Sequence, residues 1–418
     1  TAVEQVAQRY PDSDGFSSFL RRRSIVSYAI GVLADNTGRR ILDLSGDFVI
    51  GAVYSPTGHI LYRQWPPDRS NNLWAAAFDS ETLRVTGEPL LVAAGSRGVS
   101  VSFDGTLAYG SAPPGSGSVL RQLVWINRNG QVAGTIGPTH EGLNDPVLSS
   151  DEKRIAVWGG EVSSADIWIY EVERDTRSRL TNDSAQNVQP IWSPAGDSIV
   201  FVSDRNGGDF NLFITAADGS GEAGSFLTGP QGAAVGPHWS SDGRYLVFHS
   251  IGGSRDLGRF ALHENRPPEN LLVTRFEEAL AQISPDGRYV AYQSDESGRW
   301  EIYVRRFPSG EGRWQVSTDG GAHAKWSGRG DELFYVTENA LMATPVTTSP
   351  DFQPGIPQPL FTAEQIGASF GADGFWRQYD VTADGQRFVV VRDVQQDEAA
   401  TPTITVVENW AREFDGRE

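Results

Sequence analysis

The sequence predicts an all-β fold, a single β-propeller built of four-stranded antiparallel blades. Three observations support this prediction. A turn motif built around Ser-Pro-Asp-Gly recurs along the 418 residues. Short apolar runs rich in β-branched and aromatic residues surround each copy, and they are too short for helices. Such strands, four to a repeat and without a convincing helix, are typical of blades that cover each other's faces by stacking around a ring.

The repeat is clearest at residues 282–293, which read QISPDGRYVAYQ. Each copy has a Ser or Thr in the third place of this segment, and we call that residue the anchor. Successive anchors are 47, 47, 44, 47, 44, 43 and 55 residues apart. The anchors are Ser55, Ser102, Ser149, Ser193, Ser240, Ser284, Ser327 and Thr382. Asp12 holds the same place in a further copy, 43 residues before the first anchor. A period of this length indicates a repeat architecture.

Within a unit the predicted strands follow in a constant order. The first strand ends at the anchor, and the second follows the turn, as at 199–202. The third strand is exemplified by residues 301–304 and the fourth by 226–228. Asn-Gly and Asp-Gly pairs, as at 129–130 and 218–219, separate third from fourth strands, because these residues accept the positive φ of tight hairpins.

Closure of the ring follows from the last unit, which offers strands at 379–382, 387–392 and 403–408 but no fourth. We therefore expect N- and C-terminal segments to pair. Eight blades are predicted, or nine if residues 1–45 form one of their own. The expected units within one propeller of residues 1–418 are 1–46, 47–94, 95–139, 140–184, 185–230, 231–275, 276–319, 320–372 and 373–418.

Two segments resemble a known family. SPDGRYVAY at 284–292 and SDRNGGD at 203–209 are similar to the WD40-like (PD40) repeats of TolB-type propellers. The whole chain, including TGEP at 86–89 and PTITVVENW at 402–410, also resembles the extracytoplasmic propeller portion of bacterial receptor-type Ser/Thr kinases. The resemblance implies a binding scaffold outside the cytoplasm, periplasmic, on the cell surface or secreted. Neither kinase motif, His-Arg-Asp or Asp-Phe-Gly, is present in the sequence.

Composition excludes several classes of function. The chain carries 35 basic and 53 acidic side chains, a net charge of −18, which argues against nucleic-acid binding and favours basic partners. It contains no cysteine, so disulfides, thiol catalysis and cysteine zinc sites are ruled out. No run approaches the roughly 20 apolar residues of a membrane helix, so no membrane span is expected.

Two short motifs could suggest catalysis. Residues 367–371 read GASFG, which matches the G-x-S-x-G elbow of hydrolases, but no histidine follows it. Residues 219–224 read GSGEAG, which matches a dinucleotide fingerprint, but they lie where a hairpin turn is expected. We interpret the first as a glycine-rich loop and the second as a turn, and no catalytic residue is assigned.

Metal binding is left open by two features. His238 and His323 lie beside predicted inner strands, where residues from distant blades can converge on one axis. His238 immediately precedes its tryptophan and His323 lies three residues before its own, so they should not face alike, and we interpret them as structural histidines. Aspartate-rich turns at 12–15 and 204–209 could bind Ca²⁺ through oxygen atoms, but residues that cap turns have the same composition. No cofactor is expected, with Ca²⁺ or another divalent metal as the exception to test.

The preferred contact surface is a long insert at about 345–378. It carries Phe370, Phe375, Trp376 and Arg377 outside the regular strands. Packing over the ring is the alternative for these side chains. Most other tryptophans recur in register, such as Trp192 and Trp326 just before their anchors, which indicates packing between blades.

The predicted function is therefore a non-catalytic, extracytoplasmic protein-binding or assembly scaffold. Its expected partner is a protein or peptide, or a second copy of the chain bound through an unmatched terminal strand. The alternative is a metal-assisted polysaccharide lyase or hydrolase with its site in the propeller channel.

Overall fold

The computed structural model confirms the all-β prediction and divides the chain into two compact units. The larger unit is Gly117–Gln395; the smaller combines Thr1–Ser116 with Gln396–Glu418. The structure describes residues 48–65, 72–80, 82, 84–94, 96–111, 120–160, 165–206, 210–228, 233–251, 255–264, 266–370, 376–394 and 403–413. The expected copy around Asp12 and the turn at 12–15 lie outside them.

The larger unit contains six antiparallel sheets. Four of them take four consecutive strands each: β10 (Asn144–Leu148), β11 (Arg154–Gly159), β12 (Asp166–Glu171), β13 (Thr176–Arg179); β14 (Asn187–Trp192), β15 (Ser198–Ser203), β16 (Asn211–Ala216), β17 (Gly224–Leu227); β18 (Ala233–Trp239), β19 (Tyr245–Ile251), β20 (Leu257–Ala261), β21 (Glu269–Leu272); β22 (Glu278–Ile283), β23 (Tyr289–Ser294), β24 (Glu301–Arg306), β25 (Trp314–Gln315). A fifth sheet contains β26 (Ala322–Trp326), β27 (Glu332–Val336), β28 (Ala340–Thr347), β29 (Gln353–Pro354) and β30 (Gln358–Thr362).

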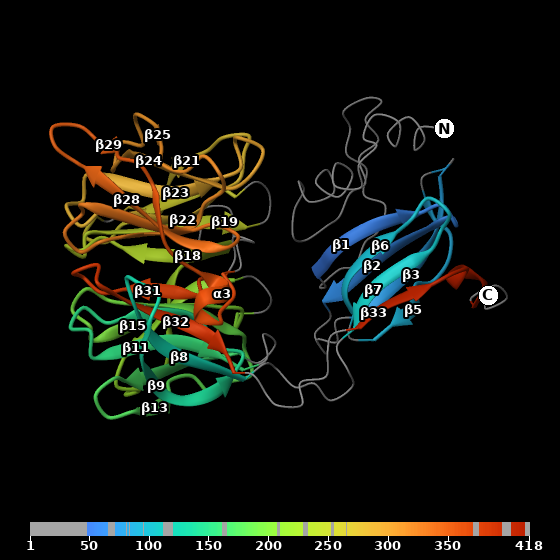
Figure 1. Cartoon of the computed structure of the whole chain (residues 1–418), viewed down its shortest axis with the longest axis horizontal. Coiled ribbons are helices and arrows are strands. Elements are labelled where there is room, and N and C mark those ends of the chain that lie inside the picture. Colours follow the sequence, from blue (N-terminus) through green and yellow to red (C-terminus); the bar gives the residue numbers. More distant parts are fainter. Residues whose placement is uncertain are drawn as a thin grey trace. The chain divides into compact units, whose positions relative to one another are not determined.

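The sixth sheet closes the ring with strands from distant parts of the chain. β31 (Tyr379–Val381) and β32 (Arg387–Asp393) are joined by β8 (Leu120–Asn127) and β9 (Val132–Glu141). β32 pairs with β8 along its whole length, from Arg387 opposite Asn127 to Asp393 opposite Arg121. Figure 1 shows the teal β8 beside the orange-red β32. This sheet therefore joins the first two strands of the larger unit to its last two.

The six inner strands form a closed circuit. β10, β14, β18, β22 and β26 contact one another in this order, and β31 contacts β10. Between β26 and β31, the Tyr379 hydroxyl donates to the carbonyl of His323 over 2.8 Å. The prediction of one ring of eight or nine blades over residues 1–418 is therefore corrected: the larger unit closes as a six-bladed ring by itself.

The smaller unit contains the two remaining sheets. β1 (Phe48–Ser55), β2 (His59–Trp65), β3 (Asn72–Asp79), β4 (Arg84–Val85) and β5 (Leu90–Ala93) form one; β6 (Ser96–Val101), β7 (Leu107–Ser111) and β33 (Thr403–Val407) form the other. Their core includes Leu61, Leu73, Leu107 and Trp410, the last in a 3-10 helix at Trp410–Glu413. The predicted unit 373–418 is thus divided, because β31 and β32 belong to one sheet and β33 to another.

The anchor residues organise every turn between the first and second strands. In seven of the eight copies the hydroxyl hydrogen-bonds to an aspartate two or four residues later. Ser284 Oγ donates to Asp286 Oδ1 over 2.6 Å and accepts from the amide of Tyr289 over 3.0 Å. The residue three places after the anchor has positive φ, which glycine accepts at Gly287 and which Glu152 adopts in its own copy. The repeat is therefore the signature of one hydrogen-bonded turn.

Neighbouring blades are joined by the tryptophans predicted to lie between them. Trp192 Nε1 donates to the carbonyl of Val147 over 2.9 Å, which links β14 to β10. Trp326 Nε1 donates to the carbonyl of Gln282 over 3.1 Å, which links β26 to β22 in the same way. Both rings are buried, so the structure bears out the packing interpretation for these two residues.

Candidate functional site

The predicted insert at about 345–378 is not free of regular structure, since it contains the end of β28 with β29, β30 and α3 (Ala363–Ile366); its four candidate contact residues lie between α3 and β31. Phe370 is buried in a core cluster with Phe361 and Tyr379. Trp376 is half-buried and packs edge-on against Trp158, with ring centroids 5.0 Å apart. These two aromatic side chains therefore match the alternative of packing over the ring. Phe375 lies outside the described residues.

Arg377, the last of the four candidate contact residues, is buried in the larger unit and is 1% exposed. Its backbone pairs with Asp145 of β10: the amide of Arg377 donates to Asp145 Oδ1, and the amide of Asp145 donates to the carbonyl of Arg377, both over 2.9 Å. Trp158 Nε1 donates to Asp145 Oδ2 over 2.7 Å. Burial raises the pKa of Asp145, and the Arg377 charge opposes this rise. The loop thus brings a guanidinium into the protein interior.

Each of five inner strands contains a β-bulge, and the bulge changes the direction of nearby side chains. The sequence pattern did not predict these bulges. Four residues before the anchor the chain adopts positive φ, at Asp145, Gln189, Gly236, Leu280 and His323. The strand register shifts at each of these points. A bulge opposes two residues to one and redirects the side chains beside it. Because the bulged residues are of five different types, only their distance from the anchor could have identified them.

His323 and His238, the two histidines singled out in the sequence, are both on inner strands. His238 Nδ1 accepts from the amide of Ile283 over 3.2 Å, and burial lowers its pKa well below the usual value. Burial, with the charges of Arg377 and Lys325, lowers the pKa of His323 to about 3. Both imidazoles are therefore neutral near pH 7.

Lys325 supplies the second buried cation of this region. Its Nζ lies 3.1 Å from Asp380 Oδ1 in an ion pair whose side chains are about nine-tenths buried. Asp380 also accepts from the amide of Leu148 over 2.8 Å. Burial lowers the pKa of Lys325 and Asp380 opposes the fall. We call Arg377, His323, His238 and Lys325 the axial cluster.

Metal binding finds no further support in the geometry. Within the described part of the chain, no three His, Cys, Asp or Glu side chains are grouped so as to hold a metal ion. Of the aspartate-rich turn at 204–209, residues 207–209 lie outside the described ranges. Asp204 accepts from the amide of Gln186 over 2.8 Å, so its carboxylate caps the backbone before β14.

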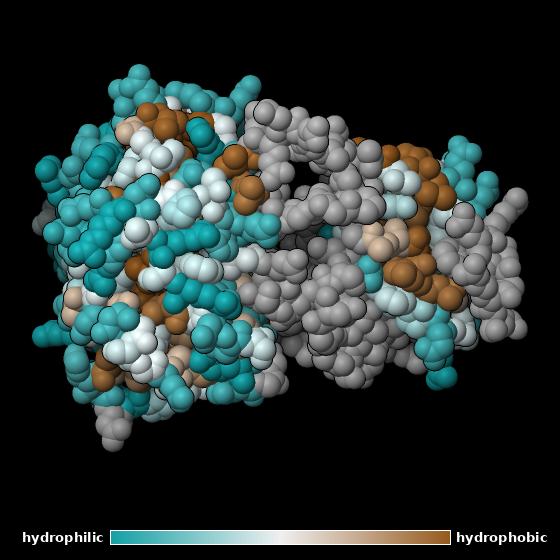
Figure 2. Space-filling view, turned by 90° about the horizontal axis from the view of Figure 1, so that it is seen from below, coloured by the Kyte–Doolittle hydropathy of each residue, from teal (hydrophilic) through white to brown (hydrophobic). Residues whose placement is uncertain are grey.

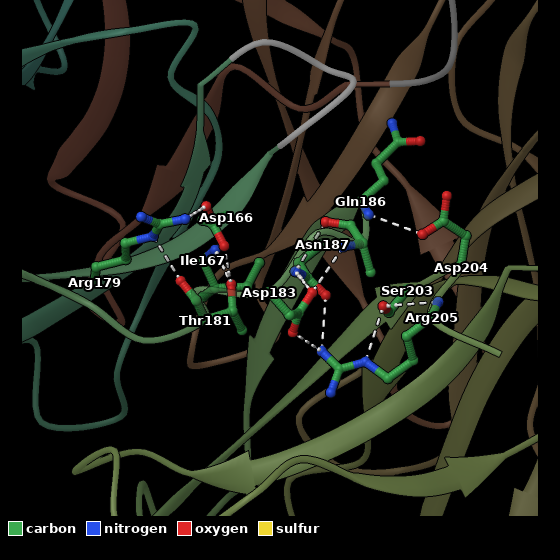
Figure 3. Close-up of polar contacts among 11 residues, drawn as sticks. Asp166, Ile167, Arg179, Thr181, Asp183, Gln186, Asn187, Ser203, Asp204 and Arg205 are labelled. Atoms are coloured by element: carbon green, nitrogen blue, oxygen red, sulfur yellow. Dashed lines mark hydrogen bonds and ion pairs between the residues drawn. The ribbon is translucent and has the colours of Figure 1, made fainter. Parts of the chain in front are cut away.

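A second polar network lies near that turn and is paired internally. Figure 3 shows the Arg205 guanidinium pointing toward Asp183, Asn187 and Ser203, to which it is bonded over 2.9–3.1 Å. Nearby, the Thr181 hydroxyl donates to Asp166 Oδ1 over 2.8 Å (Figure 3). Donors and acceptors satisfy each other here, which is the arrangement expected of a network that stabilises the fold.

The exposed edge of the smaller unit is the clearest candidate for contact with another protein. β33 is the last strand of its sheet and pairs, among the described strands, with β7 alone. Ile404 and Val406 are 77% and 61% exposed. They share a face with Gly110 and Ala108, their partners on β7. Figure 2 shows hydrophobic residues exposed on this unit.

The two catalytic-looking motifs have the structures expected of a loop and a turn. The short helix α3 (Ala363–Ile366) precedes the GASFG segment and ends at Gly367 with positive φ, whereas a nucleophile elbow needs a helix after the serine. The GSGEAG segment connects β16 to β17. The described residues contain no helix long and apolar enough to cross a membrane.

Comparison with known proteins supports the fold. Residues 100–277 match the family model PD40, the TolB beta propeller domain. The structure of a putative TolB from Agrobacterium tumefaciens is similar with a TM-score of 0.51 and 15% identity, covering 67% of this chain and all of that one. TolB from Acinetobacter baumannii has a TM-score of 0.42 and 15% identity, covering 75% and 79%. The predicted resemblance to TolB-type propellers is confirmed.

One curated relative is similar over a shorter stretch. A protein of Bacillus subtilis (strain 168) named "Uncharacterized peptidase YuxL" is 33% identical over 122 residues. These residues are 28% of this chain and 18% of that protein. The chain therefore spans less than a fifth of the length of this relative.

Proposed function

We propose that this chain, which carries a TolB-like β-propeller domain, is a non-catalytic protein-binding or assembly scaffold that works outside the cytoplasm. The observation that carries the proposal is the edge of β33 that no described strand covers. An edge strand offers a row of backbone N–H and C=O groups to an extended segment of another chain. Self-association follows when β33 of one copy pairs with β33 of another, which forms a symmetric interface.

The side chains of β33 favour such pairing. Soluble proteins protect sheet edges with charged residues or proline, and β33 carries neither in its sequence Thr-Ile-Thr-Val-Val. Ile404 and Val406 are instead apolar and exposed. Burying one such side chain fully stabilises an interface by roughly 1.5–3 kcal/mol. Burial of the two side chains together would therefore stabilise the interface by a few kcal/mol, in addition to the backbone hydrogen bonds.

Light scattering coupled to size exclusion tests the self-associating form. We expect wild type to form a dimer or larger assembly, and Ile404→Lys with Val406→Lys to be monomeric, because two cations on the edge oppose strand pairing. Ile356→Lys is the matched control, since Ile356 is 80% exposed but lies in the propeller unit. A wild-type monomer at all concentrations contradicts self-association.

Salt distinguishes a second copy from a foreign partner. Two copies that each carry −18 repel each other, so salt should strengthen self-association. A basic partner is attracted by the acidic chain, so salt should weaken that complex. A complex that weakens with salt and is lost in the double lysine variant supports a basic protein or peptide at β33.

A metal-assisted lyase or hydrolase is the second candidate. The observation that favours it is the position of His238 and His323 on inner strands of one ring. Metal analysis of the purified protein, with turnover of acidic oligosaccharides by wild type, His238→Ala and His323→Ala, tests it. Absence of both metal and turnover contradicts this candidate and leaves the scaffold proposal intact.

A further inference from the structure

Among the described residues, the axial cluster contains buried nitrogen atoms that have no hydrogen-bond partner. Nε, Nη1 and Nη2 of Arg377 have no hydrogen-bond partner among the described residues, and neither do Nδ1 and Nε2 of His323. Both side chains are 1% exposed. Buried polar groups are hydrogen-bonded in the great majority of proteins, so these two side chains require an explanation.

Asp145 does not satisfy the Arg377 guanidinium. The closest approach of the two side chains, Nε to Oδ1, is 3.6 Å, which exceeds hydrogen-bond length. Oδ1 of Asp145 already accepts the amide of Arg377, and Oδ2 accepts Trp158 Nε1. The guanidinium has five N–H donors and cannot lose its charge. No described residue accepts from its planar fork, which can therefore hold an acceptor from outside the chain.

Contacts between β26 and β31 bring His323 and Arg377 into one region of the ring: the Tyr379 hydroxyl donates to the carbonyl of His323, and Lys325 Nζ lies 3.1 Å from Asp380 Oδ1. The two charges that act on the His323 imidazole are those of Arg377 and Lys325, and the same two act on His238. A carboxylate bound by both side chains would accept from the guanidinium of Arg377 and from the imidazole N–H of His323. We propose that Arg377 and His323 bind the carboxylate of a small ligand on the axis of the six-bladed ring.

The charge balance selects a monoanion. Lys325 is paired with Asp380, and Arg377 lies beside Asp145, so the region holds no large surplus of positive charge. A buried dianion such as phosphate would leave more charge uncompensated than a carboxylate does. The guanidinium fork also matches a carboxylate with two parallel hydrogen bonds. Binding of a carboxylate here involves neither a metal ion nor a chemical reaction. The proposal does not depend on the edge of β33.

Titration of the wild-type protein with acetate, followed by NMR of its histidine imidazoles, tests the proposal first. We expect the His323 signals to shift saturably with acetate and not with chloride at equal ionic strength. His263 provides an internal control from outside the axial cluster, at the turn after β20. If no His323 signal moves with acetate, the proposal is wrong and water satisfies the donors.

Arg377→Lys then tests the guanidinium, because it keeps the charge and removes the fork. We expect acetate affinity to fall about tenfold or more, since a bidentate charged pair is lost. Arg244→Lys, on an exposed turn, is the matched control. Equal affinity in Arg377→Lys and wild type overturns the role of Arg377. Tighter binding of inorganic phosphate than of acetate overturns the assignment to a carboxylate.

Discussion

Glu278 should make the stability of this protein fall as the pH rises from about 4.5 toward about 8. The side chain lies at the start of β22 and is 2% exposed. Thr274 Oγ1 donates to Glu278 Oε1 over 2.5 Å, and Oε2 has no hydrogen-bond partner among the described residues. Burial, with smaller contributions from the nearby acids Asp256, Asp295 and Glu277, raises the pKa of Glu278 to about 8.

The sign of the effect follows from this rise. The pKa in the folded state exceeds the ordinary value of 4.5, so the folded state binds the proton more tightly than the unfolded state. The resulting stabilisation is fully present below about pH 4.5 and is lost as the pH rises toward about 8. A shift of this size corresponds to at most roughly 5 kcal/mol. The effective dielectric constant of a protein interior, which exceeds that of a dry medium, reduces this value, and we expect about 2 kcal/mol.

Urea denaturation of wild type and Glu278→Gln measures this effect. Glutamine resembles the neutral acid and keeps an oxygen for Thr274, so the variant should gain about 2 kcal/mol over wild type near pH 9 and little near pH 5. Glu264→Gln is the control, because that side chain is half-exposed in the turn after β20. The reasoning is refuted if Glu278→Gln and wild type lose stability equally over this range.

Three further predictions concern the blades and the axis. Ser284→Ala should lower the free energy of unfolding by about 1–3 kcal/mol, because the Tyr289 amide and Asp286 lose their partner; an unchanged urea midpoint contradicts this. Trp192→Phe should cost about 1 kcal/mol through the lost bond between blades, which calorimetry would reveal. In buffer without carboxylates, stability should fall as the pH drops from about 6.5 toward about 3, because the folded state binds the His323 proton less tightly. His323→Asn should flatten that dependence, and an equal acid response would count against it.

The blade is the part of the fold that sequence reasoning could predict. The turn at Ser284 is encoded by neighbouring residues, because its hydroxyl, its aspartate and its positive-φ glycine lie within a few positions of each other. Trp192 and Trp326 were predicted to pack between blades because they recur at one distance from their anchors. Such features depend on local chemistry, and local chemistry repeats with the sequence.

The candidate site was predictable only in part. His238 and His323 were correctly assigned to inner strands, β18 and β26. Arg377 was predicted to face a partner and is instead buried beside Asp145, 232 residues away along the chain. Its position depends on ring closure, which brings β31 against β10, and no pattern near residue 377 encodes this.

The sequence by itself determined that the chain is all-β, that it is built of repeated four-stranded units and that each unit turns at a Ser or Thr anchor. Only the tertiary structure decided that six sheets close one ring, that β32 pairs with β8, and that β33 lies in another sheet. Hairpins form between neighbouring residues, whose identity is written locally. Closure instead depends on how sheets stack and which distant edges meet, and a turn motif shared by eight repeats does not distinguish one edge from another.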